Sequence, residues 1–193
     1  MKMRERGAST VELLIAGAIV VVMASVALAN LKDYIGDMRL LGAGRVFTGE
    51  FRKARSVAMR LNAQTAMRFE ERADGVYYTL YADGNHNGVL SHDIARGTDY
   101  LIEGPFRLDA NMAGVRVGIM EGVPAPPPDS GLLDPADPVR FGRSNMLSFS
   151  PLGTATPGTF YLTNERLQAA VRVSPGSGRV RLMVYGGGKW RDR

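Results

Sequence analysis

The stretch that decides the fold is residues 7–29, which read GASTVELLIAGAIVVVMASVALA. Residues 13–29 are apolar apart from Ser25, and a helix needs about 17–25 such residues to span a bilayer. The leader in front of them, MKMRERG, carries three basic residues, and basic residues tend to stay on the cytoplasmic side of a membrane. We therefore predict one membrane-spanning helix, with residue 1 in the cytoplasm and the rest of the chain on the opposite side.

Glu12 stands at the start of this apolar run, where an unpaired carboxylate costs on the order of a few kcal/mol. Two plain interpretations are a membrane anchor with an incidental acid and a secretory signal cleaved after Ala27-Leu28-Ala29. Neither interpretation gives the acid a role. The segment from residue 7 to residue 15 instead resembles the class III signal of type IV pilins and pseudopilins, which a membrane prepilin peptidase cleaves after the glycine on the cytoplasmic side.

This resemblance implies roles for the residues around the cleavage point. Cleavage between Gly7 and Ala8 would make Ala8 the first mature residue and Glu12 the fifth, which is where the family carries its carboxylate. Glu12 would then pair with the new α-amino group of Ala8, in its own chain or in a neighbouring subunit, so that two charges offset each other in apolar surroundings. The family usually begins its mature chain with Phe, where this chain has Ala8, and it implies N-methylation of that residue.

Beyond residue 30 the pattern becomes amphipathic and predicts that the helix continues to about residue 62. Its apolar positions recur at spacings of four, three, four and three residues, at Phe47, Phe51, Ala54, Ala58 and Leu61. Three glycines, at positions 36, 42 and 44, each weaken a helix by about 1 kcal/mol relative to alanine. They predict a bend or a partly melted stretch, or they allow close packing. The basic residues of this segment lie mostly off the apolar stripe and are interpreted as a solvated face: Arg45, Arg52, Lys53, Arg55 and Arg60.

The remainder of the chain reads as strands and turns. Strands are expected at residues 65–70, 76–81, 100–108, 115–120, 146–150, 159–163, 169–174 and 179–185. Asp74-Gly75 and residues 175–178 supply hairpin turns, and the six prolines within residues 122–138 predict a surface loop. The fold class is therefore α+β, a long N-terminal helix packed on an antiparallel sheet domain. We expect a leader at 1–7, an apolar transmembrane or filament-core helix at 8–31, an amphipathic helix at 32–62 and a β-rich head at 63–193.

Four segments near the C-terminus narrow the resemblance to the FimT/GspH family of minor pilins and pseudopilins. They are FSPLGTA at 149–155, GTFYL at 158–162, VRVSP at 171–175 and GRVR at 178–181. The resemblance implies a type IV pilin-like fold and a low-abundance subunit that helps to initiate or cap a type IV pilus or a type II secretion pseudopilus. It also implies other pilins or pseudopilins, the prepilin peptidase and the bacterial inner membrane as partners, with a single pass and the head in the periplasm or outside.

Basic charge is concentrated at the C-terminus, where residues 166–193 hold seven basic residues and one acid. Arg179 and Arg181 lie two apart on a strand, so they share a face, and paired guanidinium groups suit phosphate. The motif resembles the arginines with which FimT-type minor pilins bind double-stranded DNA for uptake in natural transformation, and Arg172, Lys189 and Arg191 would assist. The alternative is a solvated strand face or protein contact, in a type II secretion minor pseudopilin that exports protein and binds no DNA.

Composition speaks against an enzyme. The chain has no cysteine and only two histidines, and we find no nucleophile, base and oxyanion constellation and no implied cofactor. The turn Asp83-Gly84-Asn85-His86-Asn87-Gly88 opens like a calcium loop, with Asp83, Asn85 and Asn87 as the oxygen ligands. The closing glutamate is replaced by Ile94, so a polar turn without metal is the favoured interpretation.

Overall fold

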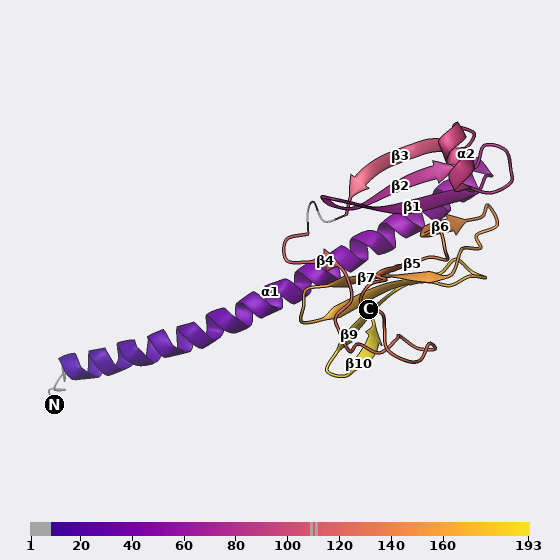
Figure 1. The fold of residues 1–193 in the computed structure, drawn as a ribbon. Helices are drawn as coiled ribbons and strands as arrows, with labels where there is room; N and C mark the ends of the chain where they lie inside the picture. The colour runs from indigo at the N-terminus through magenta and orange to yellow at the C-terminus, as the bar shows by residue number, and fades with distance from the viewer. Residues whose placement is uncertain (1–8, 109, 111) are drawn as a thin grey trace, which may run out of the picture. The chain divides into compact units, whose positions relative to one another are not determined.

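The computed structural model describes residues 9–108, 110 and 112–193, with residues 26–30 described by their backbone only. The chain divides into two compact units, Met1–Gly36 and Asp37–Arg193. Helix α1 (Thr10–Leu61) contributes to both units, and every strand belongs to the second (Figure 1). Among the described residues, the first unit is the start of α1, and the second holds the sheets and the core.

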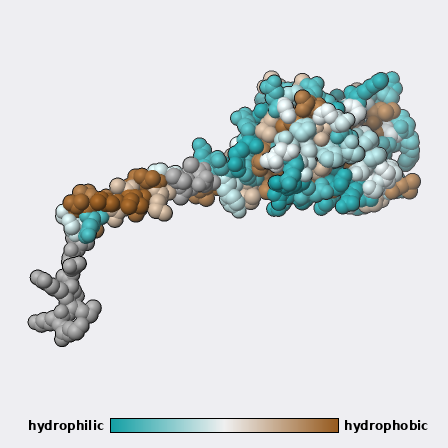
Figure 2. All heavy atoms as spheres, turned by 90° about the horizontal axis from the view of Figure 1, so that it is seen from below, coloured by the Kyte–Doolittle hydropathy of each residue, from teal (hydrophilic) through white to brown (hydrophobic). Residues whose placement is uncertain are grey.

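The helix of the first unit begins with a capping box. The Ser9 backbone N–H donates to Glu12 Oε2 at 2.9 Å, and the Val11 N–H donates to Ser9 Oγ at 3.3 Å. The apolar side chains that follow are exposed all round the helix, with Leu14 74% and Val21 66% exposed (brown in Figure 2). No helix in the part of the chain that the structure describes is long and apolar enough to cross a membrane.

Several residues of the expected leader and apolar segment lie outside the described residues. They are residues 1–8, which include Gly7 and Ala8, and the side chains of residues 26–30. The predicted cleavage point and the predicted methylation site therefore stay predictions.

In the second unit α1 continues as a regular helix through Gly42 and Gly44. The expected partly melted stretch is wrong, because packing of an apolar face stabilises a helix beyond its intrinsic propensity. Gly44 packs directly against strand β9 (Val180–Gly186), where a Cβ atom would lie 2.6 Å from Leu182 Cδ1. The missing side chain thus lets helix and strand approach closely.

The strands form two antiparallel sheets, which confirms the α+β fold class (Figure 1). The first sheet has the order β3-β2-β1-β6, and the second has the order β10-β9-β8-β7-β4, with β5 also paired to β7. The strand bounds are β1 Thr65–Arg72, β2 Gly75–Ala82, β3 Tyr100–Arg107, β4 Arg116–Val117, β5 Val139–Arg140, β6 Met146–Phe149, β7 Gly158–Thr163, β8 Gln168–Val173 and β10 Lys189–Asp192. The turns predicted before β2 and before β9 are both present.

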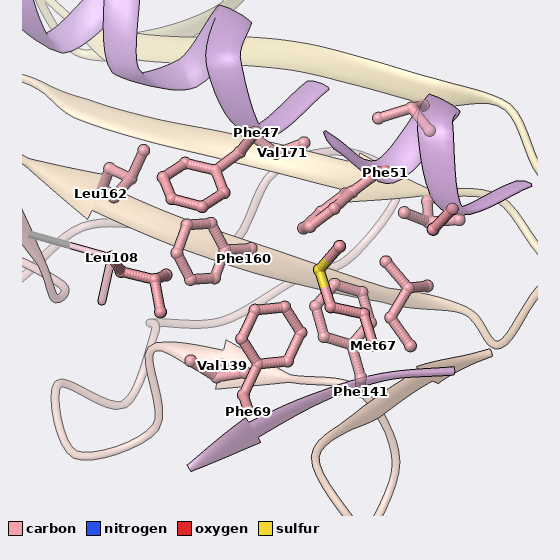
Figure 3. Packing of buried hydrophobic residues seen from close by; sticks show 14 of the residues in the cluster. Phe47, Phe51, Met67, Phe69, Leu108, Val139, Phe141, Phe160, Leu162 and Val171 are labelled. Carbon is pink, nitrogen blue, oxygen red and sulfur yellow. The ribbon is translucent and has the colours of Figure 1, made fainter. Parts of the chain in front are cut away.

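One hydrophobic core joins α1 to both sheets. At its centre Phe51 is fully buried, with its ring 5.7 Å from Phe141, 6.1 Å from Phe160 and 6.2 Å from Phe69, centroid to centroid (Figure 3). Phe69 stacks on Phe141 and on Phe160 at 5.6 Å. The predicted helical stripe is therefore the surface on which the two sheets assemble.

The structure differs from the sequence-based expectation in several places, and the short strands β5 and β10 were not predicted. The strand expected at 115–120 shortens to β4, because the Gln168 side chain bonds the Met120 N–H and the Gly118 carbonyl in place of a ladder partner. The helix α2 (Ser91–Arg96) was not predicted. The proline-rich segment is more than a surface loop: Val123 and Leu133 are 3% and 4% exposed and form a second, smaller cluster on β7, β8 and β9.

Candidate functional site

A groove rich in arginine lies between α1 and the start of β9, with a cavity volume of about 490 Å³. One wall consists of α1 side chains at spacings of three, four and three residues, which place them on one helical face. The opposite wall is the turn before β9 and the first residues of that strand. The lining residues are Arg45, Thr48, Arg52, Arg55, residues 178–182, Asp192 and Arg193.

Two glycine turns hold one end of this groove together. Gly178 has φ +56° and Gly153 has φ +84°, both in the left-handed region that glycine adopts without strain. A Cβ atom on Gly178 would lie 2.3 Å from the Gly153 carbonyl oxygen and 3.2 Å from Arg55 Nε. The turns can meet over the Arg55 guanidinium only because both lack a side chain.

The charges of the groove are poorly compensated. Arg181 Nη1 lies 3.9 Å from Asp192 Oδ2. Within the described residues, no other carboxylate forms an ion pair with an arginine of the groove, and buried Arg55 Nε has no hydrogen-bond partner. A concave surface with this excess of guanidinium groups is suited to an anion, because each group can donate two parallel hydrogen bonds to a phosphate or carboxylate.

The structure brings only part of the predicted arginine set together. Arg179 and Arg181 line the groove, whereas Arg172 does not, although it pairs with Arg181 in the β8–β9 register. The Arg172 guanidinium donates to the Pro126 carbonyl at 3.1 Å and contacts an Asp129 carboxylate oxygen at 3.0 Å. Its contacts therefore anchor the proline-rich segment.

The C-terminal segment that follows Gly186-Gly187-Gly188 forms the strand β10. Lys189 and Arg191 are exposed on it but do not line the groove. Trp190 donates its indole N–H to the Pro124 carbonyl at 2.9 Å and packs 5.5 Å from the Tyr185 ring, centroid to centroid. The single tryptophan thus packs against the second cluster.

Sequence reasoning missed the helical wall of the groove. Arg45, Arg52 and Arg55 were interpreted as a solvated face because they lie off the apolar stripe. Their own regular spacing beside that stripe was the available signal. Lys53 differs from them, since its ammonium group lies 2.6 Å from Glu103 Oε1, and this hydrogen-bonded pair raises the pKa of Lys53.

The residues of the calcium alternative, Asp83, Asn85 and Asn87, lie in a polar turn that is closed by its own hydrogen bonds. Asp83 is 5% exposed and accepts three backbone N–H groups, from Asn85 at 3.0 Å, His86 at 2.7 Å and Gly88 at 2.7 Å. The Asn87 side-chain amide donates to Asp93 Oδ2 at 3.0 Å, which lowers the pKa of Asp93. In the described part of the chain no cluster of three or more His, Asp or Glu side chains is placed to hold a metal ion.

Comparison with known proteins assigns the family. The family model of the type II transport protein GspH matches residues 43–178, about seven-tenths of the chain. The chain belongs to the GspH family. The GspH match confirms the resemblance to minor pseudopilins, and it includes the helical wall of the groove but ends at Gly178, before Arg179 and Arg181. No curated protein and no solved structure matches the chain.

Proposed function

We propose that this GspH-family chain is a minor subunit that takes part in assembling a type II secretion pseudopilus or a type IV pilus, at its initiation or its tip. In this proposal the prepilin peptidase cleaves the chain between Gly7 and Ala8, and Ala8 is N-methylated. The apolar helix anchors the precursor in the bacterial inner membrane by a single pass and later packs among the helices of neighbouring subunits. The exposed apolar side chains of residues 13–23 support the proposal, because a helix that is apolar on all sides is normally buried in a membrane or among other helices.

The carboxylate of Glu12 supports an assembly role as well. It accepts a hydrogen bond from the backbone of Ser9, the residue that follows Ala8. Removal of the leader would therefore create a free ammonium group one residue from the atom that Glu12 already contacts. Pairing of these charges, within a chain or between neighbours, would lower the cost of placing both in an apolar helical bundle.

Glu12→Gln tests this role because it keeps the shape of the side chain and removes its charge. Glu50→Gln, on the same helix, is the matched control. We expect the Glu12 variant to be cleaved after Gly7, by intact mass, but to be lost from sheared filaments, while the control is incorporated normally. Incorporation of the Glu12 variant at the level of the parent would contradict the proposal.

The arginine groove favours a second function, the binding of double-stranded DNA for uptake. Arginine residues of α1 and of the start of β9 line the groove, and a duplex presents phosphates at regular intervals that guanidinium groups can neutralise. Among the described residues that line the groove, Asp192 has the one acidic side chain, so little charge opposes a polyanion. The alternative is a subunit for protein export alone, whose groove contacts an acidic protein surface.

Salt dependence separates these alternatives. The full chain, in non-ionic detergent, is titrated with labelled duplex DNA at several salt concentrations, beside Arg52→Gln/Arg179→Gln, which removes one arginine from each wall. Lys189→Gln/Arg191→Gln removes the same charge outside the groove. Each phosphate contact contributes a slope of about 0.9, so we expect the groove variant to lose roughly 1.8 units of slope and the control much less. If the parent binds no DNA, protein export remains as the only function proposed for this subunit.

A further inference from the structure

Leu152 is held in water by a rigid turn. Its side chain is 92% exposed, more than that of any other large hydrophobic residue in the described chain. The turn is closed by the Gly153 N–H donating to the Ser150 carbonyl at 3.0 Å, the Ser150 N–H donating to the Thr154 carbonyl at 2.9 Å, and a 2.7 Å hydrogen bond between the Ser150 and Thr154 hydroxyls. Leu152 contributes almost no burial to the fold, so folding does not explain why a large apolar side chain is presented there.

This turn stands at one end of the arginine groove. A Cβ atom on Gly153 would lie 2.8 Å from Arg55 Nη2, so the backbone next to Leu152 touches the groove's arginine. The Ala155 N–H donates to the Pro175 carbonyl at 2.9 Å, which fixes the turn to the segment that leads to Arg179. An exposed leucine and uncompensated guanidinium groups are therefore presented together by two turns that are hydrogen-bonded to each other.

We propose that Leu152 is an apolar wedge that inserts between adjacent base pairs of a DNA duplex whose phosphates lie in the arginine groove. Proteins that combine phosphate contacts with an inserted leucine, phenylalanine or proline partly unstack the duplex and bend it. The proposal rests on the DNA-binding function above and adds a preference: the groove selects duplexes with easily unstacked steps such as TA over stiff A-tracts.

The charge of the surface favours DNA as its ligand, because DNA presents regularly spaced phosphates. Among the described residues, arginines line the groove with Asp192 as the one acidic side chain, and the exposed leucine belongs to the adjoining turn. One wedge beside several phosphate-binding groups matches the way proteins grip a deformable duplex.

The test uses the full chain in non-ionic detergent and two duplexes of equal length, one with 2-aminopurine at a central TA step and one with an A-tract. The variants are Leu152→Ala and, as matched control, Leu132→Ala, since Leu132 is 72% exposed but belongs to the proline-rich segment and not to the turn beside the groove. We expect the parent to raise 2-aminopurine fluorescence and to prefer the TA duplex. Leu152→Ala should abolish the rise and weaken TA binding by about 5–50-fold, because three buried carbons are lost, with the salt slope unchanged.

The outcomes distinguish this inference from the function on which it rests. Unchanged fluorescence and affinity in Leu152→Ala, with DNA still bound and the salt slope intact, would overturn the wedge and keep the DNA function. Failure of the parent to bind either duplex would overturn both. Binding of polyglutamate in place of DNA, weakened by Leu152→Ala, would assign the same surface to an acidic protein and overturn the wedge.

Discussion

Replacing Gly44 with alanine tests whether close contact between α1 and β9 forms the arginine groove. Gly49, on the same helix, is the matched control because a Cβ atom there would meet nothing within 4 Å. Glycine to alanine in a helix interior stabilises by about 1 kcal/mol, and we expect that gain for Gly49→Ala. At Gly44 the new methyl group would lie 2.6 Å from Leu182 Cδ1. Leu182 is 4% exposed and has little room to move, so overpacking of about 1–3 kcal/mol opposes the gain.

We therefore expect the two alanine variants to differ by about 1–3 kcal/mol in the free energy of unfolding, with Gly44→Ala the less stable. Urea denaturation of the full chain in non-ionic detergent, followed by the fluorescence of Trp190, measures this difference. Separation of α1 from β9 should also weaken DNA binding in Gly44→Ala and leave it intact in Gly49→Ala. Equal stabilisation by both substitutions would show that helix and strand do not approach as closely as we describe.

Three further predictions concern the core, the polar turn and the loop anchor. Phe51→Ala should lower the free energy of unfolding by about 3–5 kcal/mol, and Phe106→Ala, at a 43% exposed site, by much less in the same urea assay. Asp93→Asn should destabilise the chain at neutral pH, because the hydrogen bond from Asn87 holds the pKa of Asp93 below its usual 3.8. The stabilisation is complete above that value and is lost as the pH falls through the lowered pKa, so the urea midpoints of parent and variant should differ most at pH 7 and approach each other as the pH falls below 3.8. Arg172→Gln should leave the salt slope of DNA binding almost unchanged, since its guanidinium is held by Asp129, and a loss as large as that of Arg179→Gln would contradict the placement of these two residues.

Local patterns identified most of the elements of this fold. The spacing of Phe47 and Phe51 identified a helix because one helical face repeats every three or four residues. The turn at Asp74-Gly75 identified a hairpin because glycine tolerates the backbone angles that such turns need. Helix α2 and strand β10 were missed, since each is short and depends on contacts with distant segments, such as that of Trp190 with the Pro124 carbonyl. The burial of Val123 and Leu133, in the proline-rich segment, was missed for the same reason.

The candidate site, too, was predictable from the sequence only in part. By itself the sequence determined that Arg179 and Arg181 lie two apart at the start of a strand and that Glu12 stands alone in an apolar helix, because charge and periodicity are local properties. Only the tertiary structure decided that Arg52, Arg55 and Arg179 line one groove while Arg172 is engaged elsewhere. The physical reason is that partners far apart in sequence meet only where packing allows, and here Gly44, Gly153 and Gly178 permit the approach.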